Sequence, residues 1–156
     1  MKTQAKLKTY VLMLSTVFPK RHPKAGEPTH FPVLFRKKKI HTIRANYPLW
    51  EKRFKQVDAG NAVISVRMWL GKPYKSKQQE IAQLRNTDGI GIQRLDFVKG
   101  YLFSPQVDAQ EWYARSIDVV QLAKNDGLDK DEWAAWFNDY DLTKPMAIIH
   151  FTNFRY

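Results

Sequence analysis

The sequence predicts a mixed α+β fold in a single domain, and three observations support this prediction. The chain has 156 residues, a length that suits one hydrophobic core. Segments with the alternating pattern of β-strands outnumber those with helical periodicity, and no regular series of strand, helix and parallel strand is present. We therefore expect a small closed or half-closed β-barrel with appended helices, formed by residues 10–156 after a short polar arm at residues 1–9.

Six segments have the pattern of β-strands. Residues 10–18 form an apolar run rich in β-formers, which is typical of a strand buried on both faces. Residues 62–69 show the clearest alternation and are followed by turn-forming residues. Residues 41–44 place Thr42 and Arg44 on the same face of a strand, because side chains alternate along an extended chain. The remaining strands are expected at residues 78–84, 90–98 and 147–154.

Three segments have helical periodicity. Residues 47–57 place apolar side chains on one face of a helix that should stop near the next glycine. Residues 116–124 predict a short helix that ends at an Asn-Asp-Gly sequence. Asp129 and Glu132 have the spacing of a capping box, which predicts a helix at residues 133–140.

The composition excludes several classes of protein. The chain has no cysteine, so disulfides and thiolate metal sites are absent. The four histidines lack the spacing of metal ligands, and we expect neither a metal nor a cofactor. The apolar run at residues 10–18 is too short to cross a bilayer and is interpreted as a strand rather than a signal peptide, so we expect a cytoplasmic protein without membrane contact. Residues 19–32, which contain four prolines, are expected to form a long loop.

The charge of the chain is unevenly distributed. Residues 1–85 contain 19 Lys or Arg and 4 Asp or Glu, whereas residues 86–156 contain 7 and 11, and the net charge is +11. A strongly basic half suggests a polyanionic partner, because Lys and Arg near phosphates release condensed counterions. The alternative is a solvated basic face without a partner. We favour RNA or a nucleotide as the partner.

The basic segment that most strongly suggests a functional site is Arg36-Lys-Lys-Lys-Ile-His-Thr-Ile-Arg44. Taken alone, a charge run of this kind is most often a solvated loop that leads into a strand. Lys39, Thr42 and Arg44, however, place an amine, a hydroxyl and a guanidinium within six residues. A lysine whose pKa is lowered in a cleft can act as a base or nucleophile, and an arginine beside it can hold a phosphate or carbonyl oxygen. Lys37 and Lys38 would add phosphate contacts.

The order of these elements resembles a known family. Lys39-x-x-Thr42-x-Arg44, a central strand and a late Leu-Ala-x-x-acid-Gly helix end are similar to the ASCH domain, a branch of the PUA-like fold. The similarity covers about residues 10–154. It is supported by a second helix and a final strand after the acidic residue, as is common in that family.

The resemblance implies a PUA-like β-barrel whose cleft binds RNA or a modified nucleoside. One branch, similar to the bacterial N4-acetylcytidine amidohydrolases, hydrolyses an amide on a base with a lysine, a threonine and a glutamate. By position these roles fall on Lys39, Thr42 and Asp126, where aspartate is one methylene shorter than the family's glutamate. The alternative for Asp126 is that it only shapes the turn after its helix.

Other residues are candidates for contacts with a base or a phosphate. Trp69 and Tyr74 flank Lys72 after a strand and could stack a base and hold its phosphate, although a single tryptophan also often covers a core. Arg67 would anchor a ligand if its strand face lines the cleft, and would be an ordinary surface residue if that face meets solvent.

Three functions therefore remain open at this point. The first is an RNA- or nucleotide-binding ASCH domain with a basic cleft. The second is an enzyme, either an amidohydrolase on acylated cytidine or a metal-independent ribonuclease, in which Lys39, Thr42 and Asp126 form the catalytic group. The third is a protein-interaction module whose basic face meets an acidic partner.

Overall fold

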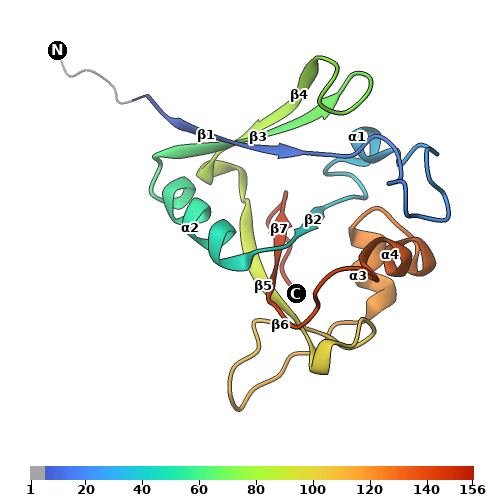
Figure 1. Ribbon diagram of the computed structural model, residues 1–156. Helices are drawn as coiled ribbons and strands as arrows, with labels where there is room; N and C mark the ends of the chain where they lie inside the picture. Colours follow the sequence, from blue (N-terminus) through green and yellow to red (C-terminus); the bar gives the residue numbers. More distant parts are fainter. Residues whose placement is uncertain (1–5) are drawn as a thin grey trace.

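The computed structural model describes residues 6–156, which form two β-sheets and four α-helices (Figure 1). The mixed α+β class expected from the sequence is confirmed. The polar arm predicted at residues 1–9 lies partly outside the described residues, and its last two residues already belong to the first strand. In chain order the elements are β1 (Lys8–Met13), α1 (Phe31–Leu34), β2 (His41–Arg44), α2 (Tyr47–Asp58), β3 (Ala62–Trp69), β4 (Gln78–Leu84), β5 (Gly91–Phe97), β6 (Pro105–Val107), α3 (Val119–Asn125), α4 (Lys130–Phe137) and β7 (Met146–His150).

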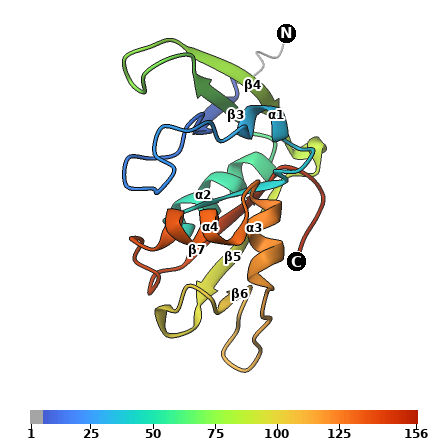
Figure 2. The same cartoon turned by 90° about the vertical axis from the view of Figure 1, so that its right-hand side faces the viewer.

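The strands are divided between a three-stranded and a four-stranded sheet. The first sheet has the order β1-β3-β4, with β1 parallel and β4 antiparallel to β3. The second has the order β2-β7-β5-β6 and is antiparallel throughout. Figures 1 and 2 show the first sheet above the second. Helix α2 contacts β3 of the first sheet and β5 and β7 of the second, so it connects the two layers.

The sheet arrangement differs from the single barrel-like sheet expected from the sequence. The strands at residues 10–18, 62–69 and 147–154 were expected to share one sheet, but β1 and β3 lie in one sheet and β7 in the other. Within the described residues no closed barrel is formed. The period of a strand shows which face is buried but not which neighbour it pairs with, and this explains the difference.

The local predictions fit the structure better. The bounds of β2, β3 and β4 are those expected, and α2 extends one residue beyond its predicted end. Asp129 and Glu132 form the predicted capping box, and because α4 begins directly after its N-cap it starts at Lys130 rather than at residue 133. Strand β6 has only three residues and was not predicted.

The core is continuous between the layers. Side chains of α2, β5, α4 and β7 are almost fully buried in it, among them Val57, Leu95, Trp133 and Ile148. Burial of this apolar surface is the main favourable term in folding. Across residues 6–156, no helix has the length and apolar character needed to cross a membrane.

Candidate functional site

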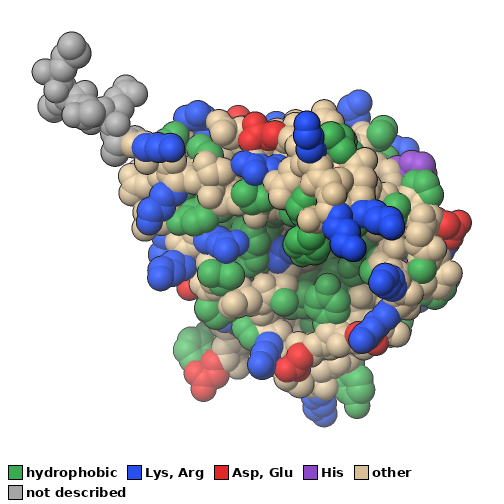
Figure 3. All heavy atoms as spheres, turned by 45° about the horizontal axis from the view of Figure 1, so that its top comes forward, with side chains coloured by type: hydrophobic (Ala, Val, Ile, Leu, Met, Phe, Trp, Pro, Cys, Tyr) green, Lys and Arg blue, Asp and Glu red, His purple; other side chains and the backbone are tan. Residues whose placement is uncertain are grey.

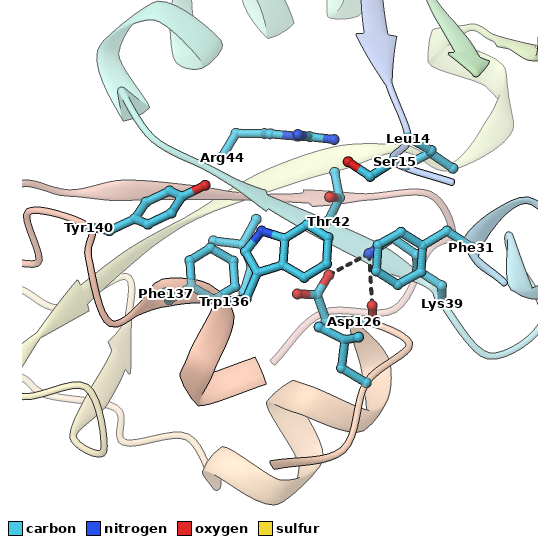
Figure 4. A pocket seen from close by; sticks show the side chains of 12 residues that line it. Leu14, Ser15, Phe31, Lys39, Thr42, Arg44, Asp126, Trp136, Phe137 and Tyr140 are labelled. Atoms are coloured by element: carbon cyan, nitrogen blue, oxygen red, sulfur yellow. Dashed lines mark hydrogen bonds and ion pairs between the residues drawn. The ribbon is translucent and has the colours of Figure 1, made fainter. Parts of the chain in front are cut away.

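A small pocket of about 30 Å³ opens beside β2, where the first sheet approaches α4 (Figure 4). Strand β2 contributes Thr42 and Arg44 from one face, as its alternation predicts. Thr42 is 5% exposed, whereas Arg44 is only partly buried. Figure 4 shows the Thr42 hydroxyl pointing toward the centre of the pocket and the Arg44 guanidinium lying across one side of it.

Lys39 enters the pocket from a tight turn that follows α1. The backbone N–H groups of Lys37, Lys38 and Lys39 all donate to the carbonyl oxygen of Leu34, at 3.0, 2.9 and 3.0 Å. Arg36 has a φ of 64°, a left-handed conformation that reverses the chain. As a result Lys37 and Lys38 face solvent, whereas Lys39 is 1% exposed.

Asp126 reaches the same pocket from the end of α3. Its carboxylate Oδ1 lies 2.7 Å from Lys39 Nζ, which also donates to the Asp126 carbonyl oxygen at 2.8 Å. The Phe31 ring lies under the ammonium group, with its centroid 4.0 Å from Nζ. Two oxygen acceptors and one aromatic face thus surround an ammonium that has lost its water.

The backbone around Asp126 leaves no room for adjustment. The Ile40 N–H donates to the carbonyl oxygen of Asn125 at 2.9 Å, which fixes the start of β2 against the end of α3. Gly127 has a φ of 81°, and a Cβ added there would lie 3.1 Å from the Lys39 Cβ. The turn therefore needs glycine both for its conformation and for the close approach of Lys39.

Burial shifts both members of the ion pair toward their neutral forms. Desolvation lowers the pKa of Lys39, the Asp126 carboxylate opposes this shift, and Arg44 adds a smaller lowering. Desolvation likewise raises the pKa of Asp126, against the influence of Lys39 and then Arg44. The direction for Lys39 is the one expected from the sequence, but the main cause is loss of water and not the neighbouring positive charges.

Arg44 connects the two sheets and keeps hydrogen-bonding capacity for a ligand. Its Nη2 donates to the carbonyl oxygen of Met13 at the end of β1, at 2.6 Å. Among the described residues no carboxylate lies within 4.0 Å of its guanidinium. Burial lowers the pKa of Arg44, yet a guanidinium remains protonated in proteins. The pocket wall thus holds a cation without a carboxylate partner.

Aromatic and hydroxyl side chains complete the pocket. The rings of Phe31 and Trp136 have centroids 5.7 Å apart, and Figure 4 shows Trp136 beside the Lys39–Asp126 pair. Ser15 enters from the chain after β1 and Tyr140 from the chain after α4, each presenting a hydroxyl to the pocket. The pocket thus presents hydroxyl groups and charged side chains between apolar walls.

A buried hydrogen-bond network lies behind Asp126. The Tyr156 hydroxyl accepts from Asn125 Nδ2 at 3.0 Å and lies 2.7 Å from His41 Nε2. Burial holds the pKa of His41 well below its usual value, so the ring is neutral and Nε2 accepts the tyrosine proton. Its Nδ1 then carries the remaining proton and faces Asp126 Oδ1 at 3.9 Å. At this distance Nδ1 makes no hydrogen bond with the carboxylate, and it has no other hydrogen-bond partner among the described residues.

A second histidine extends this network without entering the pocket. His150 Nε2 lies 2.9 Å from Gln93 Oε1, which also accepts from the Tyr156 N–H at 2.9 Å. Burial lowers the pKa of His150 to about 3, and the proximity of Arg155 adds to this. The ring is therefore neutral at physiological pH.

The other residues singled out from the sequence lie outside the pocket. Arg67 donates from Nε to Ser65 Oγ at 2.8 Å and from Nη1 to Gln78 Oε1 at 3.1 Å, on the three-stranded sheet. Lys37 and Lys38 line a separate recess next to Lys124. The remaining three residues belong to the end of β3 and the loop after it: Trp69, Lys72 and Tyr74.

Several pocket residues were not foreseen from the sequence. Ser15, Phe31 and Tyr140 come from irregular segments or short elements, where no periodicity marks an inward side chain. Trp136 was interpreted as a core residue. The only available signal was its position three residues after Trp133 on the same helix, which places the two on adjoining parts of its surface.

Comparison with known proteins adds no relative to this description: no protein-family model, no curated protein and no solved structure matches the chain.

Proposed function

We propose that the chain is an ASCH-like domain that binds a nucleoside unit, free or within RNA, in the pocket at Lys39 and Asp126. One observation carries the proposal: the polar ends of Lys39, Thr42, Arg44 and Asp126 meet in one pocket with aromatic walls. The two sheets would then be a half-open form of the PUA-like barrel, connected by the Arg44 hydrogen bond to Met13.

The chemistry of the pocket suits a nucleobase. Trp136, which is only partly buried, offers an apolar face against which a flat ring can stack. The Thr42 hydroxyl and the Asp126 carboxylate offer a donor and acceptors for the polar edge of a base. Arg44, which has no carboxylate partner among the described residues, can hold a phosphate.

The surface around the pocket supports an anionic ligand. Figure 3 shows a face of the molecule on which Lys and Arg side chains outnumber acidic ones around a recess with largely hydrophobic walls. The basic half of the sequence, residues 1–85, contributes Lys39 and Arg44 to the pocket. A positive rim raises the local concentration of phosphates and the rate of their capture.

Binding of single nucleosides and nucleotides tests this proposal. Titration of the protein with cytidine, uridine and their monophosphates, followed by calorimetry, should show saturable binding. Thr42→Val removes one buried hydroxyl and should weaken binding about 5-fold, the equivalent of one hydrogen bond. Thr87→Val, at an exposed threonine, is the matched control and should bind like the wild type. Equal affinities of the Thr42 and Thr87 variants would place the ligand elsewhere.

A second candidate function, amide hydrolysis, is favoured by the buried pair of Lys39 and Asp126. Burial lowers the pKa of Lys39, which makes its neutral amine more accessible as a general base toward water than that of an exposed lysine. The water oxygen would attack the acyl carbon while its proton passes to Lys39 Nζ, and the C–N bond would then break as Lys39 returns the proton to the departing nitrogen. The products are a carboxylic acid and the free amine of the base. Thr42 and Arg44, which both line the pocket, would hold the oxyanion.

Mass spectrometry separates hydrolysis from simple binding. Incubation of the wild type with N4-acylated cytidine should release the acyl group, and Lys39→Met should abolish the release. Lys38→Met removes the exposed neighbouring lysine and should leave the activity unchanged. RNA included in the same incubation reports shortened chains if the pair acts as a ribonuclease. Intact substrates in every incubation would remove the enzymatic candidate and leave the binding proposal standing.

A further inference from the structure

A groove of about 510 Å³ continues from the pocket along the end of the three-stranded sheet. One wall is formed by residues 13–20, which begin with the last residue of β1, and the other by Trp69, Pro73 and Tyr74. The groove and the pocket share Leu14, Ser15 and Arg44 in their linings. A ligand that fills the pocket can therefore extend into the groove past Arg44.

The far wall of the groove presents an aromatic pair to solvent. The rings of Trp69 and Tyr74 have centroids 5.3 Å apart and an interplanar angle of 52°. Tyr74 is 89% exposed and has a φ of 64°, which for a residue other than glycine costs about 1 kcal/mol or more. Neither burial nor a hydrogen bond of its side chain among the described residues offsets this cost. A strained, exposed aromatic side chain is a feature expected of a contact surface.

The loop that carries Tyr74 is held in shape without a ligand. Ser76 Oγ donates to the carbonyl oxygen of Lys72 at 2.8 Å and accepts from the Gly71 N–H at 3.0 Å. The Lys75 N–H donates to the same Lys72 carbonyl oxygen at 3.1 Å. The loop therefore holds the aromatic pair in place before a ligand binds, which reduces the entropy lost on binding.

The segments that border the groove are strongly basic. Residues 13–27 and 67–77 together contain a single acidic residue, Glu27. They contain seven basic residues: Lys20, Arg21, Lys24, Arg67, Lys72, Lys75 and Lys77. Aromatic faces within a positively charged groove are the combination that binds single-stranded nucleic acid.

We infer that this groove takes the nucleotide next to the one in the pocket, so that the ligand is single-stranded RNA and not a free nucleoside. The neighbouring base stacks on Trp69 and Tyr74, and Arg44, which lines both spaces, holds the phosphate that joins the two nucleotides. The inference rests on the proposed function, because it assumes that the pocket takes a nucleoside unit.

The test compares cytidine monophosphate with a short oligocytidylate on the same variants. The wild type should bind the oligonucleotide more tightly than the monophosphate. Trp69→Ala should weaken oligonucleotide binding by about 5- to 150-fold, the range for one lost base–aromatic stack, and leave monophosphate binding unchanged. Tyr74→Ala, at an exposed loop position, should act in the same direction, and it keeps the test valid if Trp69→Ala does not fold. Trp112→Ala, at an 83% exposed tryptophan outside the groove, should change neither affinity.

The outcomes separate the groove from the pocket. If the monophosphate binds as tightly as the oligonucleotide, or if neither aromatic variant weakens the oligonucleotide selectively, the groove is not a subsite and the pocket proposal stands. If the oligonucleotide binds but Thr42→Val alters neither ligand, the proposed function of the pocket fails, and with it the inference that two adjacent nucleotides span pocket and groove.

Discussion

Three consecutive lysines of this chain occupy opposite environments. Lys37 and Lys38 face solvent, whereas Lys39 is 1% exposed and makes an ion pair with Asp126. The three residues are chemically identical and share the hydrogen-bond acceptor of their backbone N–H groups, the Leu34 carbonyl oxygen. The difference shows that a basic run can contain both solvated residues and a buried site. The conformation of the turn determines which of the three lysines is buried.

The largest effect should come from breaking the buried pair. Asp126→Ala leaves the Lys39 ammonium without a counter-ion, and we expect the free energy of unfolding to fall by about 3–5 kcal/mol. The double variant Lys39→Met/Asp126→Ala removes both charges and should recover much of that loss. Urea denaturation of the wild type, the single variant and the double variant measures these free energies of unfolding. A loss below about 1 kcal/mol in the single variant would contradict a desolvated ion pair.

A variant at a buried, uncharged side chain separates the effect of burial on stability from the effect of charge. Tyr156→Phe removes the hydroxyl shared by His41 and Asn125, and leaving these buried groups unpaired should cost about 1–3 kcal/mol. Tyr101→Phe, at a 64% exposed tyrosine, serves as the control. The same urea denaturation should place this control within about 0.5 kcal/mol of the wild type. If the two variants are equally stable, the network behind Asp126 does not contribute to folding.

The protonation of Lys39 provides a third test. Its amine should titrate below the ordinary value of 10.5, because burial disfavours the ammonium, and Asp126→Asn should lower the pKa further by removing the charge that opposes the shift. Heteronuclear NMR of the lysine side chains measures the pKa of Lys39 in the wild type and in the Asp126→Asn variant. A higher pKa in the Asn variant would show that Asp126 does not act on Lys39.

These shifts have a definite sign in the pH dependence of stability. Between the lowered pKa of Lys39 and 10.5 the unfolded chain binds more protons, so the free energy of unfolding from this group rises with pH. Between 3.8 and the raised pKa of Asp126 the folded chain binds more protons, so the contribution of this group falls with pH. Denaturation in buffers that cover both pH ranges measures how the free energy of unfolding changes with pH in each.

The smallest effects belong to the exposed lysines. Lys37→Gln and Lys38→Gln should each change the free energy of unfolding by no more than about 0.5 kcal/mol. If RNA phosphates contact the basic face, the wild type should show a log–log salt slope of about −2 to −4, and each of these variants should reduce its magnitude by about 0.7. Titrations at several salt concentrations measure the slopes. A flat salt response in the wild type would remove the polyanion interpretation.

Local pattern predicted much of the fold and part of the candidate site. The alternation of β2 placed Thr42 and Arg44 on one face, and the capping box of Asp129 and Glu132 is confirmed, although α4 begins at Lys130 and not at the predicted residue 133. The spacing of Lys39, Thr42 and Arg44 led to three of the side chains that line the pocket, and the resemblance to the ASCH domain pointed to the fourth, Asp126. The signals from local pattern lie within a few residues of the features that they predict.

The features that were missed depend on contacts distant in sequence. The burial of Lys39 follows from a turn in which Arg36, not glycine, adopts a left-handed conformation, and no residue type marks this in the sequence. The pairing of Tyr156 with His41 joins residues 115 positions apart. The separation of the strands into two sheets depends likewise on pairing partners, which alternation alone does not specify.

The order of strand pairing has a consequence for how the pocket is assembled. Leu14 and Ser15, which line it, directly follow β1, and β1 pairs in parallel with β3, whose first paired residue comes 54 positions after Lys8. The wall made by Thr42 depends on β2, which pairs with β7 near the other end of the described chain. Non-local pairings close slowly, because loop entropy is lost before any contact compensates for it. The pocket is therefore expected to be among the last parts of the molecule to form. During synthesis, β1 remains unpaired until β3 has been made.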